Sequence, residues 1–116
     1  MKHEKMRVIK ILDEIISFSF KKDATDMNIN IRFDEEKFII QFKDNSKEVT
    51  QEEIDEIEEL INVDRQPEME EYYWELIGQQ DYADEFTLVG LMADKAHIDY
   101  DPETGMSLIL YRKFTD

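Results

Sequence analysis

The sequence predicts one α+β domain, a two-layer α/β sandwich in which helices cover one face of a four-stranded, mainly antiparallel sheet. The chain has 116 residues, 41% of them hydrophobic, which is enough to fill one core but not two. Apolar residues recur every second position in four short segments, and every three to four positions in the segments before and between them. We therefore treat residues 1–116 as a single domain.

The first expected element is an amphipathic helix over residues 4–21. Apolar residues recur there at helical spacing, and most charged residues lie on the other side. The stripe consists of Met6, Ile9, Leu12, Ile15, Ile16 and Ser19, and it is widened by Val8, Ile11, Phe18 and Phe20. Because this apolar surface is wider than one stripe, we expect the helix to pack on a sheet and to contact a second element.

A β-hairpin is expected next. Residues 27–33 alternate between apolar and polar side chains, and residues 38–42 repeat the alternation after a short polar connection. The second strand should end at Asp44-Asn45-Ser46. Thr50 followed by Glu53 forms a capping-box pattern, which predicts a helix over residues 50–62 with a solvated, anionic outer face.

Two more helices and a second hairpin should complete the domain. Residues 68–80 show helical spacing, and another helix should start at Asp84-Glu85 and end near Lys95. Residues 97–100 and 106–112 form the last two strands, joined by a turn that contains Pro102 and Gly105. In the aromatic cluster Tyr72-Tyr73-Trp74 we expect Tyr73 in the core, while Trp74 fits either the core or an exposed binding surface.

The charge and composition restrict the partners. A net charge of −15, from 29 acidic and 14 basic residues, repels phosphate backbones and anionic lipids, so we expect neither nucleic acid nor membrane as a partner. A basic protein partner fits this charge, and the alternative is an acidic surface that only keeps the domain in solution. The chain has no run of roughly 18 apolar residues and no signal-peptide core, which predicts a cytoplasmic protein.

Metal binding is not expected either. The chain has no cysteine, and its two histidines, His3 and His97, lie near opposite ends of the sequence. We expect His3 in a frayed terminus. His97 should be a structural or surface residue, because the sequence fixes no nucleophile or paired carboxylate near it.

The order of elements and three local segments resemble the GHKL-type ATP-binding domain of histidine kinases, anti-sigma-factor kinases, gyrase-type topoisomerases and Hsp90 chaperones. These segments are residues 13–16 (Asp-Glu-Ile-Ile), residues 42–46 (Phe-Lys-Asp-Asn-Ser) and residues 87–94 with the hairpin that follows. The resemblance implies that Glu14 is the remnant of the residue that activates water. It also implies that Asp44 and Asn45, together with Ser107 one position late, are the remaining candidates for nucleotide binding.

Several residues depart from the family pattern. The position of the magnesium-binding Asn holds Phe18, or Ser17 in the other register, so the Asn is missing either way, and a phenyl ring supplies none of the oxygen ligands that magnesium prefers. Ser46 and Glu48 replace the glycines of Asp-x-Gly-x-Gly, which adds bulk and negative charge beside the expected nucleotide.

The second glycine-rich motif and the adenine-binding Thr are also altered. Residues 83–86 stand where the glycine-rich motif should be and include the carboxylates Asp84 and Glu85, and Met106 stands at the Thr position. These departures predict a domain without catalysis, metal or ATP.

Two functions remain open at this stage. The first is a degenerate GHKL-like domain, a pseudoenzyme that acts as a regulatory protein-interaction module. The alternative is an ATP-binding serine kinase of the anti-sigma-factor type, or a nucleotide sensor, that retains Glu14 and Asp44 as parts of a divergent site. A subunit that only completes a larger assembly is a third class. The sequence names neither the partner nor the oligomeric state.

Overall fold

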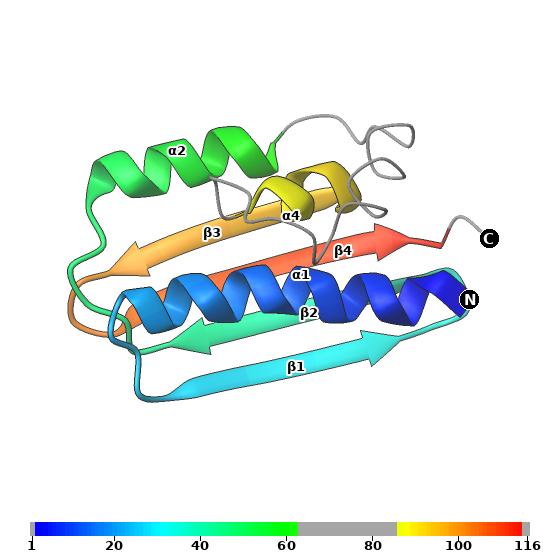
Figure 1. Cartoon of the computed structure of the whole chain (residues 1–116), viewed down its shortest axis with the longest axis horizontal. Coiled ribbons are helices and arrows are strands. Elements are labelled where there is room, and N and C mark those ends of the chain that lie inside the picture. Colours follow the sequence, from blue (N-terminus) through cyan, green and yellow to red (C-terminus); the bar gives the residue numbers. More distant parts are fainter. Residues whose placement is uncertain (1, 63–85, 115–116) are drawn as a thin grey trace.

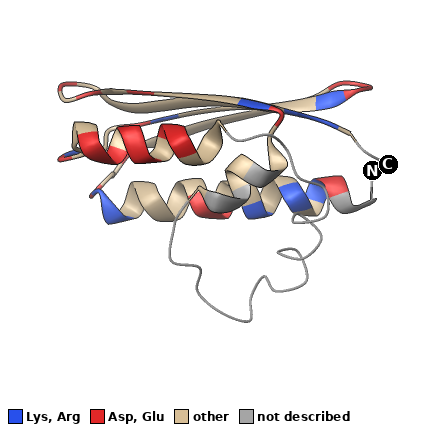
Figure 2. Ribbon diagram, turned by 90° about the horizontal axis from the view of Figure 1, so that it is seen from above, with Lys and Arg blue, Asp and Glu red and all other residues tan. Residues whose placement is uncertain are grey.

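The computed structural model describes residues 2–62 and 86–114. The elements are α1 (Lys2–Lys21), β1 (Met27–Phe33), β2 (Lys37–Asp44), α2 (Gln51–Ile61), α4 (Thr87–Met92), β3 (Lys95–Asp101) and β4 (Gly105–Lys113). The strands form one sheet in the order β1-β2-β4-β3, and every pairing is antiparallel. The three described helices lie on one face of this sheet (Figures 1 and 2). The predicted α+β class and four-stranded antiparallel sheet are confirmed.

The core lies between the central strands and the helices. Cross-strand neighbours such as Ile40 and Leu110, or Phe42 and Leu108, share the helix-facing side of the sheet because directly paired residues point the same way. Core residues from all these elements include Val8, Ile11, Ile15, Phe18, Phe38, Ile40, Phe42, Ile54, Ile57, Ile61, Phe86, Val89, Met92, Ile98, Met106, Leu108 and Leu110. The opposite face of the sheet alternates with this one and is mostly polar.

Helix α1 is turned differently from the predicted orientation. Val8, Ile11, Ile15 and Phe18 are buried, whereas three residues counted in the predicted apolar surface are exposed. These are Met6, Ile9 and Phe20, with exposed fractions of 45%, 54% and 64%. The prediction that they face the core was wrong, because α1 has two apolar stripes and its tertiary contacts decide which one meets the sheet.

A buried ion pair fixes that rotation. Arg112 Nε donates to Glu4 Oε2 at 2.7 Å and Arg112 Nη2 donates to Glu4 Oε1 at 3.2 Å. Arg112 Nη1 donates to the carbonyl oxygen of Met92 at 2.8 Å. Both charged side chains are fully buried. The three hydrogen bonds offset the cost of removing the charges from water, and they join the start of α1 to β4 and to the end of α4.

Helix α2 begins as the sequence predicts. The Glu53 amide donates to Thr50 Oγ1 at 3.1 Å, and the Thr50 amide donates to Glu53 Oε1 at 3.0 Å, so the capping box is confirmed. Ile54, Ile57 and Ile61 are buried, and the acidic residues between them line the outer face (Figure 2).

Helix α4 is shorter than predicted. It ends at Met92, and the prediction of an end near Lys95 was wrong because Ala93 is extended and the Asp94 amide donates to the carbonyl oxygen of Tyr111. The chain therefore joins the sheet just after α4. The predicted helix over residues 68–80, with its aromatic cluster, lies outside the described residues, and so do Asp84 and Glu85.

Candidate functional site

Asp44 is a buried carboxylate at the end of β2, on the helix side of the sheet. Its side chain points to the same face of the sheet as that of Phe42, two residues earlier in β2, and the residue is only 8% exposed. Asp44 Oδ1 accepts hydrogen bonds from the amides of Ser46, at 2.9 Å, and Met106, at 3.0 Å. Asp44 Oδ2 accepts a short hydrogen bond from Ser19 Oγ. One carboxylate therefore joins α1, the turn after β2 and the start of β4.

Asn45 has an equally structural set of contacts. Its Oδ1 accepts from the amides of Thr25, at 2.8 Å, and Asp26, at 3.0 Å, and its Nδ2 donates to Thr25 Oγ1 at 2.9 Å. These bonds satisfy backbone groups in the connection between α1 and β1. The amide side chain thus ties that connection to the end of β2.

The two positions where the resemblance expects glycines differ from each other. Ser46 is 1% exposed, and its hydroxyl has no hydrogen-bond partner in the described part of the chain. Glu48 is exposed and has a φ of 60°, in the left-handed region that favours glycine. At Glu48, the backbone conformation suits a glycine although the residue is a glutamate.

The β3–β4 turn lies directly against the end of β2. Gly105 has a φ of 115°, and a Cβ at this position would lie 2.1 Å from the carbonyl oxygen of Asp44. Only glycine fits such an approach without a backbone shift. This contact places the amide of Met106 against the Asp44 carboxylate.

The side chain of Glu14, on α1, reaches the first turn of α4. Its Oε1 accepts a hydrogen bond from the Val89 amide at 3.1 Å, in the first turn of α4. Phe86, the N-cap residue of α4, makes no side-chain cap and has a φ of 71°. A carboxylate from another helix therefore takes the role that a capping side chain normally has at such an amide.

Two further contacts pack α4 into this region. Phe18, where the resemblance expects a magnesium ligand, is buried and makes an edge-to-face contact with Phe86, with ring centroids 5.3 Å apart. A Cβ on Gly90 would lie 1.9 Å from the carbonyl oxygen of Leu60, so α4 and the end of α2 approach closely. Ser17, the alternative position for the ligand, is exposed.

Ser107 lies apart from the other candidates. It pairs with Lys43 on β2, so its side chain is on the face of the sheet away from the helices, whereas Met106 and Asp44 are on the helix side. Asp44 and Ser107 both line a small concavity beside the β3–β4 turn, although their side chains leave the sheet on opposite faces. The alternation of Met106, Leu108 and Leu110 with Ser107 already carries the signal for this placement.

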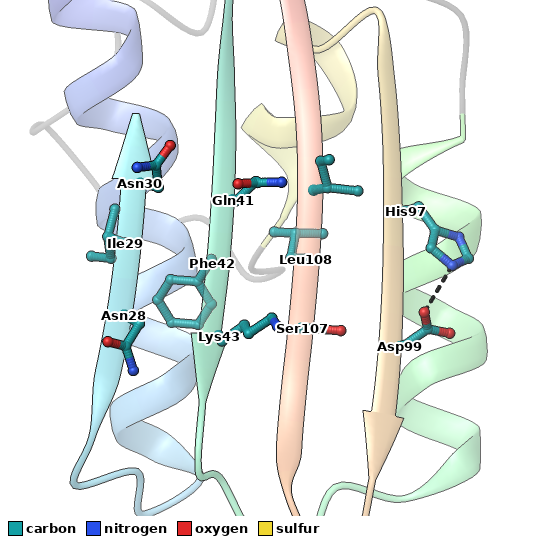
Figure 3. Close-up of a pocket in the computed structure, with 11 residues that line it drawn as sticks. Asn28, Ile29, Asn30, Gln41, Phe42, Lys43, His97, Asp99, Ser107 and Leu108 are labelled. Atoms are coloured by element: carbon teal, nitrogen blue, oxygen red, sulfur yellow. Dashed lines mark hydrogen bonds and ion pairs between the residues drawn. The ribbon is translucent and has the colours of Figure 1, made fainter. Parts of the chain in front are cut away.

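The face away from the helices has a shallow concavity of about 560 Å³ (Figure 3). Polar side chains from all four strands line it, among them Asn28, Gln41, Ser107 and the pair of His97 with Asp99, whose Nε2 and Oδ2 atoms are 3.0 Å apart. His97 and Asp99 are both well exposed. Sequence reasoning did not single out this surface, although the polar positions of the alternating strands mark it.

Two carboxylates outside these sites have lowered pKa values. Hydrogen bonds from the amides of Glu36 and then Lys37 lower the pKa of Asp34 in the β1–β2 turn. The pKa of Glu53 is lowered first by the ammonium group of Lys22 and then by the Thr50 amide. Within residues 2–62 and 86–114, no cluster of three or more His, Asp or Glu side chains has a metal-binding arrangement.

The comparisons with known proteins leave the family open. No model of a known protein family matches the chain, and a search of curated proteins finds no match. Among the described helices, none has both the length and the apolar character of a membrane span.

Proposed function

We propose that this chain is a degenerate GHKL-like domain that acts as a regulatory protein-interaction module and does not turn over ATP. The observation that carries the proposal is that Glu14, Asp44 and Asn45 are all engaged in hydrogen bonds within the domain. The order of α1, a hairpin, helices and a second hairpin agrees with the order of elements in that family.

The contacts of Asp44 oppose nucleotide binding. To recognise the adenine amino group, a carboxylate oxygen must accept a hydrogen bond from the ligand. Asp44 Oδ1 already accepts from Ser46 and Met106 and Oδ2 from Ser19, so three of about four acceptor positions of this buried carboxylate are used within the domain. Breaking one of these bonds would leave a buried group unsatisfied, which costs about 1–3 kcal/mol.

The contact of Glu14 opposes phosphate binding at α4. A triphosphate held at the start of this helix would need backbone amides, and the Val89 amide already donates to Glu14. The carboxylate also brings a negative charge to this position, which repels phosphate oxygens. Glu14, which would activate water in an active member of the family, therefore has a structural role in the non-catalytic domain that we propose.

Thermal melting with and without ATP and magnesium tests the loss of nucleotide binding. A ligand at about 100 times its Kd adds about 2.7 kcal/mol to the free energy of unfolding, which raises Tm by roughly 10 °C in a domain of this size. We expect no such shift at millimolar ATP and no release of phosphate.

A shift of several degrees would contradict this proposal and support the alternative, a nucleotide sensor or serine kinase. Asp44→Asn is the matched control, because in that alternative it would reduce the shift by weakening adenine recognition. The variant must be compared with its own melting curve in the absence of ATP, since Asp44 also holds three segments together.

The protein-interaction part of the proposal rests on the outer face of α2. Five acidic side chains are exposed there within eleven residues, and they are Glu52, Asp55, Glu56, Glu58 and Glu59. Such a surface attracts a basic partner. A variant with Glu56→Gln and Glu59→Gln should keep the fold, as judged by circular dichroism, and should lose binding to that partner. Equal binding by the variant would exclude this face.

A further inference from the structure

Among the described residues, nothing gives the outer edge of strand β1 the usual protection of an edge strand. Within residues 2–62 and 86–114, no strand pairs with its outer edge. Edge strands in monomeric proteins are usually protected by charged residues, proline, bulges or a covering helix. β3, at the other edge, carries Lys95, Asp99 and Asp101 and packs against α2. β1 has the sequence MNINIRF, with one charged residue and no proline.

The apolar side chains next to this edge are unusually exposed. Ile29, Ile31 and Phe33 pair with core residues of β2 and so face the helix side, but they remain 41%, 38% and 45% exposed. Helix α1 lies over the side of the sheet that carries β1 and β2 (Figure 1), and Ile29, Ile31 and Phe33 remain an exposed apolar strip along the free edge of β1.

We infer that this surface is a homodimer interface in which β1 pairs antiparallel with β1 of a second copy, centred on Asn30. This register pairs all seven residues of the strand and places Ile29 opposite Ile31 of the other copy, on the helix side. Met27 and Phe33 form the next pair on the same side. The two sheets then become continuous, and the exposed apolar residues of both copies meet across the two-fold axis.

The charges of the strand favour a second copy as the occupant. In the register centred on Asn30, Arg32 lies opposite Asn28, so no like charges are paired. Residues 27–33 contain no acidic residue, although the chain has 29. The strand is also its own complement, because its alternation of polar and apolar residues matches itself when reversed. β1 of a second copy thus supplies the alternate side chains that strand addition requires.

A cysteine pair tests both the contact and its register. The chain has no native cysteine, so Asn30→Cys introduces a single thiol that would face its own copy. Directly opposed residues of antiparallel strands have Cα atoms about 4.5–5.5 Å apart, which suits a disulfide. The matched control is Gln41→Cys, on the same face and in the same row but one strand further from the axis, where the two thiols would be about 14 Å apart.

Under mild oxidation we expect at least about tenfold more covalent dimer from Asn30→Cys than from Gln41→Cys. Equal yields from the two variants would overturn the proposal. Sedimentation of the wild-type chain should show a dimer, and a monomer at all concentrations up to about 100 μM would also overturn it. A monomer that pairs instead with an extended segment of another protein gives the same negative result in this experiment.

A second pair of variants separates this interface from general loss of apolar surface. Ile29→Thr combined with Ile31→Thr keeps the β-branched shape that strands favour, and should raise the dissociation constant at least about tenfold. Ile109→Thr removes an apolar side chain of similar exposure, 43%, from the face away from the helices, and it should leave the dissociation constant of the dimer unchanged. If Ile109→Thr has the same effect, β1 is not the interface. The result does not depend on ATP binding, so it can fail or succeed independently of the proposed function.

Discussion

Three residues other than glycine have positive φ angles in the described part of the chain, and each lies where one element gives way to another. Asp23 follows α1, Glu48 precedes α2 and Phe86 begins α4, with φ angles of 60°, 60° and 71°. A residue with a Cβ loses about 1–2 kcal/mol in this region compared with ordinary helical backbone. The strain at Glu48 is informative because the resemblance to GHKL-type domains expects a glycine at this position.

We predict that Glu48→Gly gives a more stable protein than Glu48→Ala. Both changes remove the same exposed charge, but only glycine relieves the left-handed backbone, and the gain is partly offset by the greater freedom of the unfolded chain. The expected difference in the free energy of unfolding is about 0.5–1 kcal/mol, measured by urea denaturation. A stability of the alanine variant equal to or above that of the glycine variant would contradict the left-handed conformation.

Glu14→Ala should destabilise the domain through the start of α4. The substitution leaves the Val89 amide without its acceptor, which costs about 1–2 kcal/mol, whereas Glu14→Gln keeps an acceptor oxygen and should cost less. Asp13→Ala, at the exposed neighbouring position, is the control and should change little. Hydrogen exchange at the Val89 amide should increase in Glu14→Ala. Equal effects of the Asp13 and Glu14 changes would show that the capping contact is unimportant.

The sequence could identify these candidate residues but not their partners. The hydrogen bond from Met106 to Asp44 joins residues 62 positions apart, and that from Val89 to Glu14 joins residues 75 apart. Such contacts have no local pattern, because they depend on how the elements pack. The placement of Ser107 on the opposite face is different, since strand alternation alone determines it.

At the scale of elements, local patterns predicted both hairpins, the helix over residues 4–21 and the start of α2, while packing decided the rotation of α1 and the end of α4. Alternation and capping act within a few residues, so they are visible in the sequence. The rotation of α1 depends on the ion pair between Glu4 and Arg112, which joins opposite ends of the chain. The end of α4 depends on Asp94, which pairs with β4 instead of continuing the helix.

Arg112→Met should destabilise the domain more than a change of both partners. The single substitution removes the two hydrogen bonds and the charge that Arg112 supplies to the buried Glu4 carboxylate, which costs about 3–5 kcal/mol. Glu4→Met combined with Arg112→Met removes both charges, and should recover most of this loss. Urea denaturation of the two single variants and the double variant measures the coupling. Additive losses would show that the two side chains do not act as a pair.

The cap of α2 should make a small, pH-dependent contribution. Lys22 first, and then the Thr50 amide, lower the pKa of folded Glu53 below its ordinary value of 4.5, so its contribution is present above that value and is lost as the pH falls through the lowered pKa. Glu53→Gln keeps a capping acceptor but does not titrate. At pH 7 we expect the free energy of unfolding of the wild type to exceed that of this variant by under about 1 kcal/mol, because the Lys22–Glu53 pair is partly exposed.

Denaturation at several pH values checks this sign. The difference between wild type and Glu53→Gln should shrink below about pH 4.5. Glu52→Gln, an exposed residue one position earlier, controls for the loss of one negative charge from the helix. A difference that grows as the pH falls would contradict the assignment of the lowered pKa to the Lys22 contact.

In the described part of the molecule, the outer face of α2 and the helix-free face of the sheet differ in charge. The outer face of α2 is acidic. The face of the sheet away from the helices carries five basic residues and two acidic ones. These are Arg32, Lys37, Lys43, Lys95 and Lys113, with Asp99 and Asp101. Helix α2 contacts β3, the edge strand furthest from β1. A dimer joined through β1 therefore keeps its two acidic helices far apart.

This arrangement predicts that salt strengthens the dimer. Each copy carries a net charge of −15, so the two copies repel each other, but the β1 contact itself has no ion pairs to be weakened. The α2 helices of the two copies would be roughly 30 Å apart, several times the Debye length of about 8 Å at physiological salt. Raising the salt from about 20 mM to about 200 mM should lower the dissociation constant severalfold in sedimentation experiments. Binding of a basic partner to α2 should weaken over the same range, because that contact depends on opposite charges. A dimer that dissociates as salt rises would instead require an interface held by ion pairs, and the uncharged pairing of β1 would then be wrong.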